Sequence, residues 1–197
     1  MMFKLLSADP KSQLGLNFKA LFEVTRDGRK LTRLFKAGDE YVKIQQLLTG
    51  ELHRQQVLKL TGFIGMAFYW SFDNLDWLSK SKLIEKNPNY VYYSNLGWFV
   101  GNLCNLVLDS LALQDNLANE EKWMKGNSRD TDSHVNKLRK ERFDILVRYP
   151  KTLGDLTLSA HNCAFPQKFG VTLSDGTVGA AGMVAALAVL YDIWRKL

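Results

Sequence analysis

Two carboxylates interrupt one of the most aromatic stretches of the chain, AFYWSFDNLDWLSK at residues 67–80. Paired carboxylates can act as general acid and base when a pocket brings a nucleophile to them. On a helix, Asp73 and Asp76 share a face with Lys80, and Asp76 and Lys80 are spaced for a local ion pair. Because the sequence offers no partner nucleophile, we interpret these residues as a polar seam that fixes the register and orientation of helices.

A second polar stripe lies on the next apolar segment, at helical spacing. Unpaired polar groups are costly in lipid or in a protein core, so the two stripes are expected to face each other or a shared water layer. The alternative is a pore or solute path, which polar residues of membrane helices often line. The residues assigned to this polar seam or pore are Asp73, Asn74, Asp76, Asn95, Asn102, Asn105 and Asp109.

Other chemistry is poorly represented in the sequence. We find no metalloprotease motif, no cysteine pair at zinc spacing and no phosphate-binding loop. The run GTVGAAG at 176–182 resembles a dinucleotide fingerprint only superficially, because it lacks the preceding strand and the downstream acidic residue. His53, His134 and His161 are scattered without companion ligands. We therefore predict a protein that is not an enzyme and that has no metal site and no cofactor.

The composition is that of a folded domain with an acidic partner. The chain has 197 residues, of which 46% are hydrophobic, and a formal net charge of +6. The positive charge favours nucleic acid or an anionic membrane surface. Lysine and arginine are spread over the chain and no nucleic-acid module accompanies them, so we predict no nucleic-acid partner. Two cysteines, Cys104 and Cys163, offer no disulfide framework and suit a reducing compartment.

Helical spacing recurs throughout and strand alternation is hard to find, so we predict an all-α fold. More specifically, we expect a membrane-associated helical bundle with amphipathic helices and a C-terminal transmembrane helix. We predict one domain over residues 1–197, with a solvated helix restarting near Ser133 and an amphipathic helix over Phe143–Ala164 interrupted by Pro150. Its other elements are a basic amphipathic helix at 29–50, hydrophobic helices at 53–83 and 90–113, a charged loop at 114–142 and a membrane span at 177–194.

The predicted helix at 29–50 carries an apolar face and basic flanks. It has two interpretations: it packs its apolar stripe on the protein's own core, or it lies in the headgroup region and wedges one leaflet. The face contains Leu31, Leu34, Phe35, Gly38, Tyr41, Val42, Gln45 and Leu48, with Arg29, Lys30, Arg33, Lys36 and Lys43 around it.

The last segment is apolar and rich in small residues. No charged residue lies between Thr177 and Tyr191, and counting on to Trp194 gives about the minimum length of a bilayer span. Small residues at such spacing let helices approach closely in lipid. Arg195 and Lys196 follow the span, which places the C-terminus in the cytosol. The residues assigned to helix packing or oligomerisation are Gly176, Gly179, Gly182 and Ala186.

Several blocks in order resemble the peroxisomal biogenesis factor 11 family of peroxisome membrane proteins. RKLTRLFKAG at 29–38 resembles its basic signature, and FYWSFDNLDWLSKSKLI at 68–84 resembles its aromatic block with Asp-Asn and a lysine-rich turn. The apolar run at 92–113, GDLTLSAHNC at 154–163 and the glycine-rich end at 173–194 resemble the blocks that follow. Together they cover nearly the whole chain.

The resemblance implies a peroxisomal membrane protein, or a glycosomal one in trypanosomatids, that self-associates and promotes elongation and division of the organelle. It implies that the amphipathic helix inserts into the cytosolic leaflet of an anionic phospholipid membrane. A solute channel is the alternative function, and recruitment of the organelle fission machinery by the charged loop is a third hypothesis. The residues mapped to the membrane are Arg29, Lys30, Leu31, Arg33, Leu34, Phe35, Lys36, Val42 and Leu48.

Overall fold

The computed structural model describes residues 13–51, 53–125 and 131–197. These residues form helices and no strand, so the all-α prediction is confirmed. The helices are α2 (Gln13–Leu31), α3 (Lys36–Leu48), α4 (Arg54–Lys80), α5 (Asn89–Lys125), α6 (Thr131–Asn162), η1 (Pro166–Phe169) and α7 (Asp175–Trp194). Among the described connections, a turn joins α2 to α3 and one 3-10 helix, η1, precedes the last helix.

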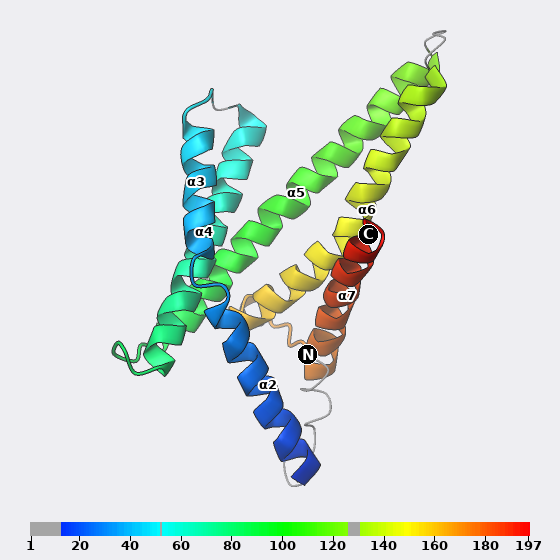
Figure 1. Ribbon diagram of the computed structural model, residues 1–197. Coiled ribbons are helices and arrows are strands. Elements are labelled where there is room, and N and C mark those ends of the chain that lie inside the picture. Colours follow the sequence, from blue (N-terminus) through cyan, green and yellow to red (C-terminus); the bar gives the residue numbers. More distant parts are fainter. Residues whose placement is uncertain (1–12, 52, 126–130) are drawn as a thin grey trace.

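The chain is a series of antiparallel helix pairs (Figure 1). Helix α4 packs on both α3 and α5, α5 pairs with α6, and α7 lies along α6. The α5–α6 hairpin extends away from the α3–α4 pair, while α2 projects in another direction. Because α5 and α7 both run antiparallel to α6, they run in the same direction as each other.

The α4–α5 contact depends on glycine. A Cβ atom on Gly97 would lie 2.6 Å from the carbonyl oxygen of Gly65, and one on Gly65 would lie 2.9 Å from the backbone nitrogen of Gly101. Gly62 has Cys104 Cβ at 3.2 Å from its Cβ position. The two backbones therefore approach more closely than any other residue type would allow, which is the packing that membrane helices favour.

Small residues also join α6 to α7. A Cβ atom on Gly154 would clash with the carbonyl oxygen of Ala181 and would lie 2.9 Å from Ala185 Cβ. On α7 the buried side is formed by Val178, Gly179, Gly182 and Ala185. Most of the apolar surface of α7 faces outward, since only 22% of its most apolar window is buried by the chain.

Within the described residues, two helices are long and apolar enough to cross a membrane. They are α5, with a mean hydropathy of 1.4 over its most apolar window, and α7, with 1.6. The second matches the predicted C-terminal span.

The predicted helix at 29–50 is divided in the structure. Helix α2 ends at Leu31 and α3 begins at Lys36, with a turn between them. The turn is built from i to i−3 hydrogen bonds, from the backbone N–H of Arg33 to the Lys30 carbonyl and from that of Lys36 to the Arg33 carbonyl. Continuous helical spacing did not reveal this break, because contacts with a distant helix determine it.

The prediction of a charged loop at 114–142 is wrong for 114–125 and 131–142, and residues 126–130 lie outside the described residues. Helix α5 continues to Lys125 and α6 begins at Thr131, so both charged runs are helical. Although these segments have few apolar residues, ion pairs between α5 and α6 stabilise them as helices. Glu120 of α5 accepts hydrogen bonds from Arg139 at 3.0 Å and Arg142 at 2.6 Å, both in α6. Pro150 also does not interrupt the helix, since α6 runs through it and bends along its length.

Candidate functional site

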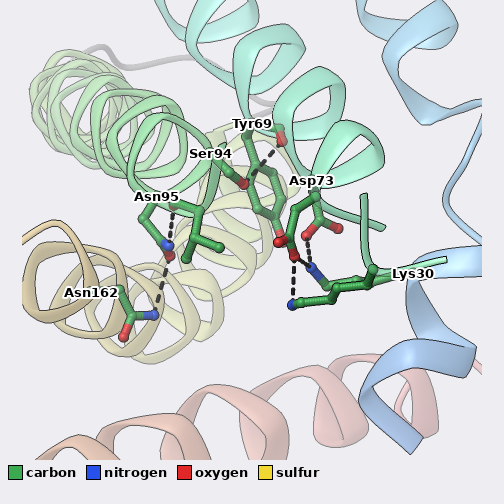
Figure 2. Close-up of polar contacts among 9 residues, drawn as sticks. Lys30, Tyr69, Asp73, Ser94, Asn95 and Asn162 are labelled. Carbon is green, nitrogen blue, oxygen red and sulfur yellow. Dashed lines mark hydrogen bonds and ion pairs between the residues drawn. The ribbon is translucent and has the colours of Figure 1, made fainter. Parts of the chain in front are cut away.

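The turn between α2 and α3 is held on α4 by a group of charges, which we call the Lys30 cluster: Lys30, Asp73, Asp76 and Lys80. Lys30 Nζ lies 2.7 Å from Asp73 Oδ1 and 2.5 Å from Asp76 Oδ2 (Figure 2). Lys80 Nζ adds the predicted local pair, 2.7 Å from Asp76 Oδ2. The side chains of Lys30, Asp73 and Asp76 are 13%, 11% and 9% exposed. The cluster therefore joins residues 46 positions apart away from bulk water.

Aromatic and backbone contacts also attach the α2–α3 turn to α4, and we call the whole of this attachment the joint. Arg33 and Lys36 lie over the Trp70 ring, at 5.4 Å and 5.2 Å from its centroid. Asn74 Nδ2 donates to the carbonyl oxygen of Leu34 at 2.6 Å. The basic signature and the aromatic Asp-Asn block, which are separate in the sequence, are thus the two halves of one contact. This contact explains why an aromatic segment carries two carboxylates and an asparagine.

The charges in the cluster support one another. Burial acts to lower the pKa of Lys30, but its hydrogen bonds to Asp73 and Asp76 and their negative charges outweigh burial and raise it above the usual lysine value. For Asp76, burial acts to raise the pKa, and the bonds to Lys30 and Lys80 outweigh it and hold the pKa below the usual aspartate value. Both groups therefore stay charged throughout the neutral range.

Lys30 does not have the lipid contact predicted for it, because its ammonium group is enclosed by two carboxylates. Arg33 and Leu34 are half-buried at the joint, whereas Lys36 and Phe35 are exposed. For Arg29 and Leu31, the side chains lie outside what the structure describes.

Helix α3 leaves much of its predicted apolar stripe exposed, while the Tyr41 hydroxyl lies 3.3 Å from Ser71 Oγ of α4. It packs on α4 through a different side, formed by Ala37, Glu40, Ile44 and Leu47. Phe35 in the preceding turn is 88% exposed, and three further apolar side chains of the stripe are about half exposed. We define the α3 stripe as Phe35, Tyr41, Val42 and Leu48, none of which is buried by the described chain.

The two polar stripes do not face each other, contrary to the prediction. Asn95 Oδ1 accepts a hydrogen bond from Asn162 of α6 at 3.2 Å (Figure 2). Asp109 pairs with Arg148 of α6 at 2.9 Å. The asparagine amides of Asn95 and Asn102 also donate to carbonyls of their own helix. The glycine contact occupies the α4–α5 interface, and Asn95 and Asp109 are turned toward α6, whereas Asn105 Oδ1 lies 4.0 Å from the Cβ position of Gly62 on α4. Asn105 is exposed.

The glycine stripe of α7 is used within the chain. Gly179 and Gly182 are buried, while Gly176 and Ala186 are exposed. Packing by the first two is therefore satisfied by α6 rather than by a second copy. Self-association through the exposed positions stays a prediction.

Three features that position the helices around α4 were not predicted from the sequence. Helix α2 was not predicted, although Leu14, Phe18 and Leu21 have helical spacing. The close approach of α4 and α5 was missed too, although the pairs Gly62 with Gly65 and Gly97 with Gly101 were readable. The third is the joint itself, for which opposite charge in the two blocks was the available signal. Among the described residues, no group of three or more His, Cys, Asp or Glu side chains could hold a metal ion.

The comparison with known families follows this geometry. The sequence profile described as Peroxisomal biogenesis factor 11 (PEX11) matches residues 1–194. The chain belongs to this family. It is also similar to the Peroxisomal membrane protein 11 homolog of Dictyostelium discoideum, with 25% identity over 203 residues, covering 90% of this chain and 78% of that protein. No solved structure matches the chain.

Membership of the peroxisomal biogenesis factor 11 family identifies a peroxisomal membrane protein that takes part in peroxisome biogenesis. The two apolar helices α5 and α7 agree with a membrane location. The contact between the basic signature and the aromatic block is then a structural feature of a membrane protein. It lies where α2 and α3 meet α4, the helix that packs on the candidate span α5.

Proposed function

We propose that this protein elongates peroxisomes and promotes their division by inserting the α3 stripe into one leaflet of the membrane. The observation that carries the proposal is that the α3 stripe is at least half exposed along its whole length in the described chain. An amphipathic helix lying at the acyl boundary expands one leaflet and bends the bilayer.

The size of the stripe fits this role. Moving a fully exposed large apolar side chain out of water is worth about 1.5–3 kcal/mol. Phe35 is 88% exposed, and the other three side chains of the stripe are about half exposed, so each of those three would contribute about half of that value. Lys36 lies beside the stripe and is exposed, and Arg33 is half-buried, so both have access to lipid headgroups. Attraction to anionic phospholipid would add to the apolar contribution. The Lys30 cluster holds the end of α2 on α4, and the packing of α3 on α4 determines which side of α3 stays exposed.

The rest of the proposal extends from the family. We propose a protein that is not an enzyme, that forms homo-oligomers, that recruits fission machinery, and whose C-terminus is cytosolic. A glycosomal location would apply in a trypanosomatid. The channel alternative lacks a supporting contact, since Asp73, Asn95 and Asp109 each have a partner in another helix or in the α2–α3 joint.

The test is the length of peroxisomes in cells that express the tagged full chain. Phe35→Asp with Val42→Asp places two charges in the α3 stripe, at exposed positions that the fold does not depend on. We expect the variant to reach the membrane and to lose elongation, because inserting two carboxylates at the acyl boundary is strongly unfavourable.

The matched control is Gln46→Asp with Gln55→Asp. It adds the same two charges at exposed positions outside the stripe. Elongation by the control and not by the stripe variant would support insertion of α3. Equal elongation by both would contradict it and would point to self-association or to partner recruitment.

A further inference from the structure

The two candidate spans end at the same height along α6. The apolar part of α5 ends at Asp109, whose carboxylate lies 2.9 Å from Nη2 of Arg148. The apolar part of α7 ends near Arg195, whose Nη1 lies 2.5 Å from Asp144 Oδ1. Asp144 and Arg148 are one helical turn apart on α6, a separation of about 6 Å along its axis.

The opposite ends also meet at one level. Near the start of α5, Asn95 bonds Asn162 at the end of α6, and the Phe99 ring lies 4.8 Å from that of Phe165. Helix α7 begins only after η1, which follows the end of α6. Between the two levels, Gly154 of α6 packs on Ala181 and Ala185 of α7. The same section of α6 therefore lies beside both spans over their whole apolar length.

We infer that α6 crosses the membrane between α5 and α7. Two parallel spans need a return crossing, and α6 is the helix that runs antiparallel to both (Figure 1). From Asp144 to Asn162 it has a length of about 28 Å at 1.5 Å per residue, which matches a hydrocarbon core of about 30 Å.

The four charged side chains of this section of α6, Asp144, Arg148, Lys151 and Asp155, all have ionic partners, which is what a crossing helix requires. Arg148 pairs with Asp109 at the end of the section, and Lys151 Nζ lies 3.2 Å from Asp155 Oδ2. The lysine is close enough to the same end for its side chain to reach the headgroups. Ser159 is fully buried, and its hydroxyl donates to the Asp155 carbonyl at 2.8 Å.

If α6 crosses the membrane, the segments at its two ends lie on opposite sides of the membrane. Beyond Asp109, α5 continues for 16 residues, about 24 Å, as a hairpin with α6. Its cross-links are polar, such as Tyr149 to Ser110 at 2.9 Å and Asn116 to the Leu138 carbonyl at 3.0 Å. This hairpin and the C-terminus lie on one side of the membrane, while the α4–α5 turn and η1 lie on the other.

The test uses single cysteines in the full chain, in sealed peroxisomes treated with a membrane-impermeant maleimide. The positions are exposed ones: Glu121→Cys in the hairpin, Lys196→Cys at the C-terminus, Lys86→Cys in the α4–α5 turn and Lys168→Cys in η1. The wild-type chain gives the background, since Cys104 and Cys163 are buried. Permeabilised organelles establish that each new cysteine reacts.

We expect positions 121 and 196 to behave alike and opposite to positions 86 and 168. One pair should lose at least ten-fold of its labelling in sealed organelles and recover it on permeabilisation. Protection of 121 but not of 196, or the reverse, would overturn the crossing of α6. Equal labelling of all four positions would overturn it as well. Neither result depends on peroxisome length, so failure here is distinct from failure of α3 insertion.

Discussion

Helix α4 has two interfaces that are built in opposite ways. Toward α5 it presents Gly62 and Gly65, and the two backbones touch. Toward the α2–α3 turn it presents Asp73 and Asp76, which hold Lys30 through charge. The first interface depends on shape and has no titrating group at its closest point, whereas the second depends on ionisation. Conditions that alter charge should therefore release α2 and the α2–α3 turn while leaving the α4–α5 pair in place.

The largest effect is expected from filling the glycine interface. Gly97→Val should separate α4 from α5, because even a Cβ atom would lie 2.6 Å from the Gly65 carbonyl oxygen and 2.8 Å from the Tyr69 nitrogen. Overpacking against backbone should lower the free energy of unfolding by about 3 kcal/mol or more. Unfolding of the full chain in detergent micelles, followed by circular dichroism, measures this.

Gly176→Ala is the matched control for that variant. Its Cβ atom would have only Ser174 Oγ nearby, at 3.7 Å, so the extra methyl group is accommodated. Stability should stay the same or rise by up to about 1 kcal/mol from helix propensity. A Gly97→Val chain as stable as the control would show that backbone contact does not hold the pair.

The second effect comes from removing the cation of the joint. Lys30→Met keeps the length of the side chain and leaves Asp73 and Asp76 facing each other with Lys80 as the remaining cation. Breaking a buried ion pair from one side typically costs about 3–5 kcal/mol, and the presence of Lys80 should place this variant near the lower figure. Hydrogen exchange should become faster in α2 and in the turn, and stay slow around Gly65 of α4.

Two further variants separate charge from general damage. Lys30→Arg keeps the cation and should retain most of the protection. Asp73→Asn together with Lys30→Met removes a buried carboxylate and should recover part of the loss. Equal exchange in the wild type and in Lys30→Met would mean that Trp70 and Asn74, rather than the ion pair, hold the turn.

How far the sequence predicts these interfaces depends on the range of each interaction. The pairing of Asp76 with Lys80 was predictable because four residues separate them on one helix. The contact of Lys30 with Asp76 was not, since neither helical spacing nor composition places residues 46 positions apart together. The all-α fold and the α7 span follow from local pattern and were predicted correctly. The helices at 114–125 and 131–142 were predicted as a loop because a dense run of charged residues is typical of a linker. The ion pairs of Glu120 with Arg139 and Arg142, which connect the two helices, could not be predicted from local pattern.

The third effect is a dependence on pH that only the ionic interface should have. The folded state lowers the pKa of Asp76, so the stability from this group is present above the ordinary aspartate pKa of about 4 and is lost as the pH falls through the lowered value. Lys30 has a raised pKa, so its contribution is present below about pH 10.4 and is lost as the pH rises through the raised value.

The joint should therefore be stable from about pH 5 to pH 9 and weaken below about pH 4. Hydrogen exchange of α2 at pH 3 and pH 6, corrected for the intrinsic rate, should reveal the loss, and the region around Gly65 should keep its protection. In Asp76→Asn the contribution of this group to the difference should disappear. Parallel loss in both regions would show that acid acts on the whole fold and not on the joint.

The smallest effect is expected from the cations over Trp70. Arg33→Gln and Lys36→Gln each remove one charge from the ring while keeping a polar side chain of similar reach. A cation over an aromatic ring at a partly exposed site is worth about 0.5–1 kcal/mol, so each variant should speed exchange in the turn only a few-fold. The change should be smaller than that of Lys30→Met, because neither cation is enclosed by carboxylates as Lys30 is. A loss as large as that of Lys30→Met would mean that the aromatic side of the joint carries as much stability as the Lys30 cluster, and that α4 holds the turn by two equal contacts.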